Sequence, residues 1–147
     1  MSDRDADSVF RRVCEEFPGV VWLRPYDMSQ ITFINSDVEE AFGIDRQDIY
    51  TDADTYIEGI HPDDRAAYRS LLESVRDRAL DDGVAERREI EYRLRKGKTD
   101  ARFLETIFPV WNRDGALLLW AGFGQEITEQ RNREEILQLQ TDQLELL

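Results

Sequence analysis

The sequence is poor in cysteine, histidine and lysine, and it has no long hydrophobic run. Cys14 is the only cysteine, which excludes an internal disulfide and a multi-cysteine metal site. His61 is the only histidine, and its place directly before Pro62 favours a helix start over a haem ligand. No apolar run approaches the roughly 18 residues that cross a bilayer, and the N-terminus lacks the apolar core of a signal peptide. We therefore expect a cytoplasmic protein with no membrane span in this segment.

The charge is strongly acidic, and almost all of the positive charge is arginine. The formal net charge is −13, and Lys96 and Lys98 are the only lysines among 19 basic residues. An acidic surface repels phosphate, which argues against a nucleic-acid partner. A surface of this kind stays hydrated and resists aggregation when salt screens charge, which favours a high-salt cytoplasm. An acidic protein from a GC-rich genome, whose codons favour arginine, would have the same composition.

Three apolar runs in the second half of the chain predict three antiparallel strands. Glu89–Arg95 alternates apolar and charged residues, which is the period of a strand with one solvent-exposed face. Arg102–Trp111 and Leu117–Ile127 follow, and Asn112–Gly115 between them contains the Asp-Gly pair of a tight hairpin. The last run is apolar on both faces, so we expect it at the centre of the sheet.

The other segments predict helices and two more strands. An amphipathic helix is expected at residues 7–17, and strands at Gly19–Arg24 and Ile31–Ile34. The main helix should begin at His61–Asp64, where Pro62 suits the first helical position and the aspartates the positive end of the helix dipole, and end near Gly83. The order of elements gives a single α+β domain, with five antiparallel strands and helices on one face.

Two helices carry apolar side chains that indicate a parallel homodimer. The N-terminal stripe comprises Val9, Phe10, Val13 and Phe17. Three turns are too few for a stable isolated helix, so the stripe must pack on the sheet, on another chain, or on both. In the last helix, Glu129–Leu147, a weak heptad seam of Ile136, Leu139, Gln143 and Leu146 would continue the contact.

Five motifs in this order resemble the PAS family, in its common bacterial and archaeal form with a PAC-like second half. The matching segments are Phe33–Ser36 with Phe42-Gly43, His61–Asp64, Glu91–Arg95, Asn112–Gly115 and Gly122–Glu129. Glu126 stands where the family usually has Asp, and Lys96–Asp100 replaces a Lys-Asp-Gly turn. The resemblance implies a PAS domain at 19–128, an N-terminal helix at 1–18 and an exit helix from 129 to 147.

The resemblance also implies a strand order and a role. The order is 2-1-5-4-3, and the role is sensing or dimerisation within a longer signalling chain. That chain would be a histidine kinase or a transcription regulator, with a covalently linked output domain after the exit helix. Glu126, Ile127 and Thr128 would relay the signal, with Thr128 as helix N-cap and Glu126 bonded to nearby backbone or to an arginine.

Four side chains are candidates for a ligand pocket between the main helix and the sheet: Tyr56, Tyr68, Leu72 and Tyr92. The alternative is a filled core whose tyrosine hydroxyls reach the backbone. Asn35 either caps the short helix that follows it or also touches the ligand. Trp22, Trp111 and Trp120 are expected to pack the helix-free face of the sheet.

The sequence carries no signature of a cofactor or of a catalytic site. Cys14 lacks the Asn-Cys-Arg-Phe context of flavin-adduct light sensors, and there is no phosphate loop, zinc spacing or Ser/His/Asp set. We expect no haem, flavin or metal and no catalysis by this fragment. The two hypotheses that remain are a sensor of an unidentified small ligand and a ligand-free scaffold for homodimerisation and relay.

We predict that salt stabilises this protein. At a net charge of −13, self-repulsion destabilises the compact state in dilute buffer, because the Debye length reaches about 30 Å at about 0.01 M salt. The melting temperature, followed by circular dichroism, should climb steadily into molar salt. A flat or falling curve would contradict the high-salt hypothesis.

Overall fold

The five strands form one antiparallel sheet in the computed structural model, which describes residues 3–95 and 101–145. The strands are β1 (Val20–Pro25), β2 (Phe33–Ile34), β3 (Arg88–Arg93), β4 (Arg102–Trp111) and β5 (Leu117–Glu126). Their order is β2-β1-β5-β4-β3, which confirms the expected topology and the central place of the last strand. The Lys96–Asp100 loop lies outside the described residues.

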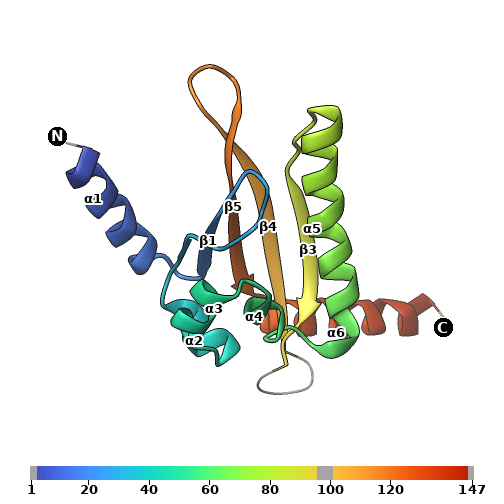
Figure 1. Ribbon diagram of the computed structural model, residues 1–147. Helices are drawn as coiled ribbons and strands as arrows, with labels where there is room; N and C mark the ends of the chain where they lie inside the picture. Colours follow the sequence, from blue (N-terminus) through green and yellow to red (C-terminus); the bar gives the residue numbers. More distant parts are fainter. Residues whose placement is uncertain (1–2, 96–100, 146–147) are drawn as a thin grey trace.

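Helices cover one face of this sheet and flank it at both ends (Figure 1). The helices are α1 (Asp3–Glu16), α2 (Asp37–Phe42), α3 (Arg46–Thr51), α4 (Asp54–Ile57), α5 (Pro62–Asp82) and α6 (Thr128–Glu145). In Figure 1, α5 stands alongside β3, and α6 crosses at the lower end of β3 and β4. None of the described helices is long and apolar enough to cross a membrane.

The main helix α5 begins and ends at the predicted signals. Pro62 occupies the first turn, and the His61 side chain accepts a hydrogen bond from the backbone N–H of Asp63. Gly83 ends the helix in the left-handed conformation, with φ at +67°. Glycine adopts this conformation without steric cost, and its N–H reaches back to carbonyls of the last turn. Two other expected boundaries shift: α1 begins at Asp3 rather than at residue 7, and β2 spans only Phe33–Ile34.

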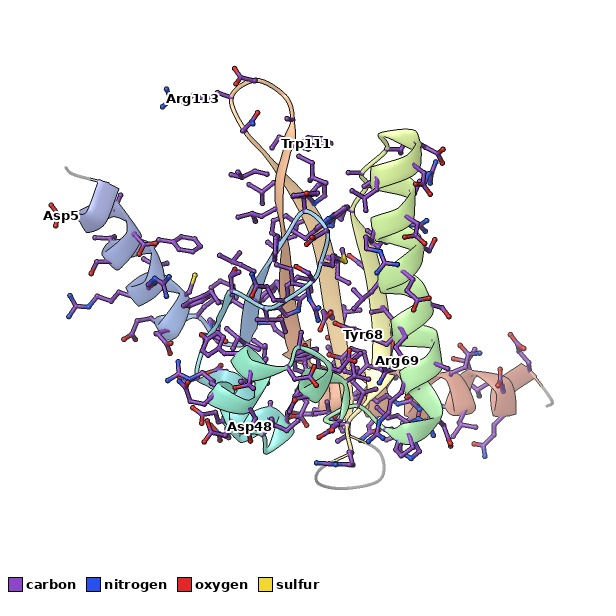
Figure 2. All side chains as sticks on the ribbon, viewed as in Figure 1. Asp5, Asp48, Tyr68, Arg69, Trp111 and Arg113 are labelled. Atoms are coloured by element: carbon purple, nitrogen blue, oxygen red, sulfur yellow. The ribbon has the colours of Figure 1, made fainter. Side chains whose placement is uncertain are left out.

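The tryptophan prediction is wrong for two of the three residues. Trp22 and Trp120 are fully buried in the core on the helix-covered face of the sheet, while Trp111 is 47% exposed on the protruding β4–β5 hairpin (Figure 2). The register explains the burial, because Trp22 pairs with Gly122 across β1 and β5. A Cβ atom on Gly122 would lie 1.9 Å from the Trp22 ring, so only glycine leaves room for the indole.

The opposite face of the sheet is apolar and only partly covered. Phe17 of the segment after α1 packs edge-on against Phe123 of β5, with 4.5 Å between ring centroids. Phe10 lies 6.4 Å from Phe33 by the same measure. The N-terminal stripe nevertheless stays exposed, with Val9 at 52% and Val13 at 59%. Within one chain, α1 therefore buries only part of its apolar surface.

Candidate functional site

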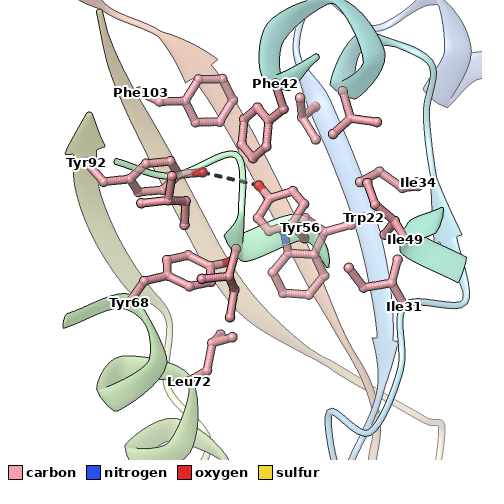
Figure 3. Close-up of a cluster of buried hydrophobic side chains, with 14 of the residues drawn as sticks. Trp22, Ile31, Ile34, Phe42, Ile49, Tyr56, Tyr68, Leu72, Tyr92 and Phe103 are labelled. Carbon is pink, nitrogen blue, oxygen red and sulfur yellow. Dashed lines mark hydrogen bonds between the residues drawn. The ribbon is translucent and has the colours of Figure 1, made fainter. Parts of the chain in front are cut away.

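A buried carboxylate bonded to three tyrosines lies between the helices and the sheet. Figure 3 shows the three tyrosine side chains in the surrounding core, with a dashed line for the hydrogen bond between the Tyr56 and Tyr92 hydroxyls. Glu105 projects from β4 and is fully buried. Its Oε1 accepts hydrogen bonds from the hydroxyls of Tyr56 on α4 and Tyr92 on β3, the latter at 2.9 Å. Its Oε2 accepts from Tyr68 on α5 at 2.5 Å. One side chain thus joins two helices to two strands.

Burial controls the ionisation of this cluster. It is the largest cause that raises the pKa of Glu105, while the three tyrosine hydroxyls donate to the charged form and oppose part of the rise. Burial, followed by the charge of Glu105, raises the pKa of each tyrosine well above its ordinary value. The three phenols therefore remain protonated donors across the physiological pH range.

The predicted pocket residues come together, but their polar partner was missed. Tyr56, Tyr68 and Tyr92 are at most 2% exposed, and Leu72 is 8% exposed in the same core. The filled-core alternative expected the hydroxyls to bond the backbone, whereas they bond Glu105. The alternation of Phe103, Glu105 and Ile107 on the inward face of β4 is a sequence signal that identifies Glu105 as buried.

Asn35 does not cap α2, which corrects one prediction for this residue. Its Oδ1 accepts from the backbone N–H of Val21 at 2.9 Å, and its Nδ2 donates to the carbonyls of Cys14 and Gly19, each at 2.8 Å. The N-cap position of α2 is Ser36, whose side chain makes no capping bond. Asn35 therefore connects the end of α1 to the start of β1.

The exit joint, which we define as Arg102, Glu126, Ile127 and Thr128, connects the sheet to α6. The backbone N–H of Arg102 donates to Thr128 Oγ1 at 2.8 Å, and the N–H of Ile127 donates to the Arg102 carbonyl at 2.9 Å. Thr128 is the first residue of α6 rather than its N-cap, and its hydroxyl bonds β4. Glu126 bonds the Thr128 hydroxyl at 3.0 Å, not an arginine or the backbone as predicted.

A second contact holds α6 against the edge strand. Arg131 of α6 donates to both carboxylate oxygens of Glu91 on β3, from Nε at 3.0 and 3.1 Å and from Nη2 at 2.8 Å. Hydrogen bonds to Glu91 are the first cause that raises the pKa of Arg131. Paired donors from one guanidinium fix an orientation as well as a distance. The first turn of α6 is thus positioned by β3 and β4 together.

A hollow of about 1100 Å³ opens beside the exit joint. Its walls come from α2, the start of β1, the start of β4, the end of β5 and the beginning of α6. They include Asp37, Ala41, Phe103, Glu126 and Thr128. Both polar and apolar side chains line it. Among residues 3–95 and 101–145, no group of three or more His, Cys, Asp or Glu side chains is placed to hold a metal ion.

Solved structures share this arrangement of strands and helices. A domain named as part of a light and redox sensing histidine kinase from Haloarcula marismortui is 25% identical, with a TM-score of 0.58 over 82% of this chain and 98% of that one. The PAS domain of Bordetella pertussis BvgS is 20% identical, with a TM-score of 0.63 over 97% of this chain and 99% of that one. The N-terminal domain of a diguanylate cyclase with a PAS/PAC sensor from Marinobacter aquaeolei is 16% identical, with a TM-score of 0.59 over 77% and 98%.

Sequence comparison gives the family. No curated protein matches the chain. The family model described as the PAS fold matches residues 31–124, which is more than half of the 147 residues. This chain therefore belongs to the PAS family.

Proposed function

We propose that this chain is the sensory input module of a signal-transduction protein of the histidine kinase or transcription-regulator type. It is not itself catalytic, and it passes a change in its core to an output domain through α6. The observation that carries the proposal is that β4 holds both the buried Glu105 and, three residues earlier, the Arg102 of the exit joint.

Strand β4 offers a short path from the core to α6. A displacement of Glu105 by a change at Tyr56 or Tyr68 moves the strand that bonds Ile127 and Thr128. Strand β3 adds a second connection from the core to α6. Tyr92 bonds Glu105, and the preceding residue, Glu91, bonds Arg131 of α6. Signalling proteins are also the source of the similar domains from Haloarcula and Marinobacter.

The second candidate is a ligand-free scaffold for homodimerisation and relay. It is favoured by the direct bonds between the three hydroxyls and Glu105, since a ligand between them would have to displace one hydroxyl. Under this hypothesis the input is a change in an attached domain or partner, and the exit joint transmits that change to α6. The ligand hypothesis requires polar groups in the core other than these hydroxyls.

The proposed assembly is a homodimer in the cytoplasm of a halophilic archaeon. Val9, Phe10 and Val13 on α1 are 46% to 59% exposed, and Ile136, Leu137 and Leu139 on α6 are 55% to 64% exposed. A second copy would cover both sets, as helices too short or too polar to be stable alone require. Leu146 of the predicted seam lies outside the described residues. The charge of −13 with two lysines supports the halophilic source.

The relay is tested by removing one hydroxyl from the core. Tyr68→Phe deletes the only donor to Glu105 Oε2 among the three tyrosines. Hydrogen exchange followed by NMR should show faster exchange at the amides of Arg102 and Ile127, relative to Val21 on β1. The reason is that β4 loses a charge-assisted bond of about 1.5–3 kcal/mol.

The matched control for the relay test is Tyr26→Phe, because Tyr26 is 52% exposed and the chemical change is identical. It should leave the exchange pattern at the exit joint unchanged. If Tyr68→Phe accelerates exchange only within α4 and α5, the core is not connected to α6 and the proposed relay is wrong.

The dimer is tested by placing a charge in the α1 stripe. Phe10→Asp would bury an unpaired carboxylate in the contact between copies and should give a monomer by light scattering at several concentrations. Leu80→Asp is the control, since Leu80 is 49% exposed on α5, away from the stripe. Deleting residues 129–147 should weaken the dimer less than Phe10→Asp. A monomeric parent chain, or a Phe10→Asp variant that dimerises unchanged, would mean that α1 packs only on its own sheet.

A further inference from the structure

A row of alternating charges connects α6 to the sheet beside the exit joint. We call it the exit clamp, and its members in order are Glu135, Arg102, Glu91, Arg131 and Glu134. A nitrogen of Arg102 lies 3.7 Å from a carboxylate oxygen of each of its two partners. The corresponding distances from Arg131 are 2.8 Å to Glu91 and 2.6 Å to Glu134. Two guanidiniums thus hold together carboxylates of α6 and of the edge strand β3.

Apolar contacts do little to hold α6 in this position. Between Thr128 and Glu145 no residue of the helix is buried, and Ile136, Leu137 and Leu139 are 55% to 64% exposed. The exit joint attaches α6 at its first residue, and a helix attached at one end can turn about that end. The direction in which α6 crosses the end of the sheet (Figure 1) therefore depends on the exit clamp.

The exit clamp is accessible to salt. Its side chains are 26% to 59% exposed, and together with Gln138 they line a hollow of about 480 Å³. At about 1 M salt the Debye length is about 3 Å, which is shorter than the 3.7 Å pairs of Arg102. Exposed ion pairs are weak even in dilute buffer, so screening removes much of their attraction.

The attachment point of α6 and the fold as a whole respond differently to salt. The exit joint includes hydrogen bonds between uncharged groups, from the Arg102 N–H to Thr128 and from the Ile127 N–H to the Arg102 carbonyl, which screening leaves intact. The compact state carries a net charge of −13 and gains stability when salt screens its self-repulsion. Salt therefore weakens the exit clamp while it stabilises the domain to which α6 is attached.

We propose that the exit clamp is an ionic-strength switch, which docks α6 on the sheet in dilute salt and releases it in molar salt. The released helix stays attached at the exit joint and turns about it. The inference rests on the proposed role of α6 in output and names the physical condition that controls this helix. In the salt-rich cytoplasm proposed above, a fall in salt concentration is the change that docks α6.

The test measures the docked fraction of α6 by NMR. A nitroxide is attached to Leu137→Cys in a Cys14→Ser background, because Leu137 is 62% exposed and does not line the hollow. The ¹⁵N-labelled nitroxide chain is diluted with unlabelled chain that lacks the nitroxide, so that the broadening arises within one chain. Broadening of the Glu91 and Arg102 amide signals should fall at least about threefold between about 0.05 M and about 2 M KCl, as the docked population falls.

A pair of arginine variants on α6 tests whether the exit clamp causes this response. Arg131→Met leaves Glu91 facing Glu134 and Glu135 without the guanidinium between them, so α6 should already be released in dilute salt. Arg133→Met is the matched control on the same helix, since Arg133 is 71% exposed and pairs with Glu129 of α6 itself. It should keep the wild-type response to KCl.

Two further measurements separate screening from other effects of salt. The melting temperature of the wild-type protein should rise over the same range of KCl, which shows that release is not unfolding. Glycine betaine at the same osmolality carries no net charge and should leave α6 docked. An equal loss of broadening in betaine would overturn the assignment to ionic strength.

The remaining outcomes separate the switch from the proposed relay. Broadening that stays constant from dilute to molar KCl overturns the switch, and so does a wild-type response in Arg131→Met. Either result leaves the relay standing if Tyr68→Phe still alters exchange at Ile127. Release of α6 by KCl, without any effect of Tyr68→Phe, would support the switch and contradict the proposed route from the core.

Discussion

One buried carboxylate holds the helical layer to the sheet. Isolated in the core, the charge of Glu105 would cost several kcal/mol, so it persists only because Tyr56, Tyr68 and Tyr92 donate to it. Each charge-assisted bond returns about 1.5–3 kcal/mol, and the three together offset part of the cost of burial, which still leaves the pKa of Glu105 raised. The same balance makes the loss of any one partner costly, because the carboxylate remains in place with fewer donors.

The packing around this cluster depends on glycines in the central strand. Glu105 pairs with Gly124 of β5, and a Cβ atom on Gly124 would come within 2.1 Å of the Phe103 ring. With no side chains at Gly122 and Gly124, the sheet has room for Trp22 and Phe103 on its inner face. The tyrosines of α4, α5 and β3 then close over them, with Tyr68 and Tyr92 at 5.5 Å between ring centroids. Because β5 has no side chains at Gly122 and Gly124, aromatic side chains from neighbouring strands can fill the core above it.

Local patterns in the sequence predicted the fold well and the site only in part. The Asp-Gly hairpin, the alternation in Glu89–Arg95 and Pro62 at the start of α5 depend on neighbours along the chain, so they could be interpreted without a structure. The positions of Trp22 and Trp120 depend on which face of the sheet the register selects, and that prediction failed. The tyrosines were identified as inward, but their convergence on Glu105 requires four elements placed in space. Thr128 was recognised as part of the joint, while its bond to Arg102 links residues 26 apart in sequence.

The central claim is that Glu105 is a buried acid whose ionisation is tied to the folded core. The direct measurement is the free energy of unfolding of the wild-type protein and of Glu105→Gln, across a pH window that begins at about pH 4, just below the ordinary pKa of a glutamate, and extends upward to about pH 9. Because burial raises the folded-state pKa of Glu105, its contribution to stability is fully present below the unfolded pKa and declines as the pH rises through the folded pKa. The wild-type protein should therefore lose stability relative to Glu105→Gln as the pH rises through that window. Two parallel curves would show that Glu105 titrates alike in the folded and unfolded chains, which would contradict the account.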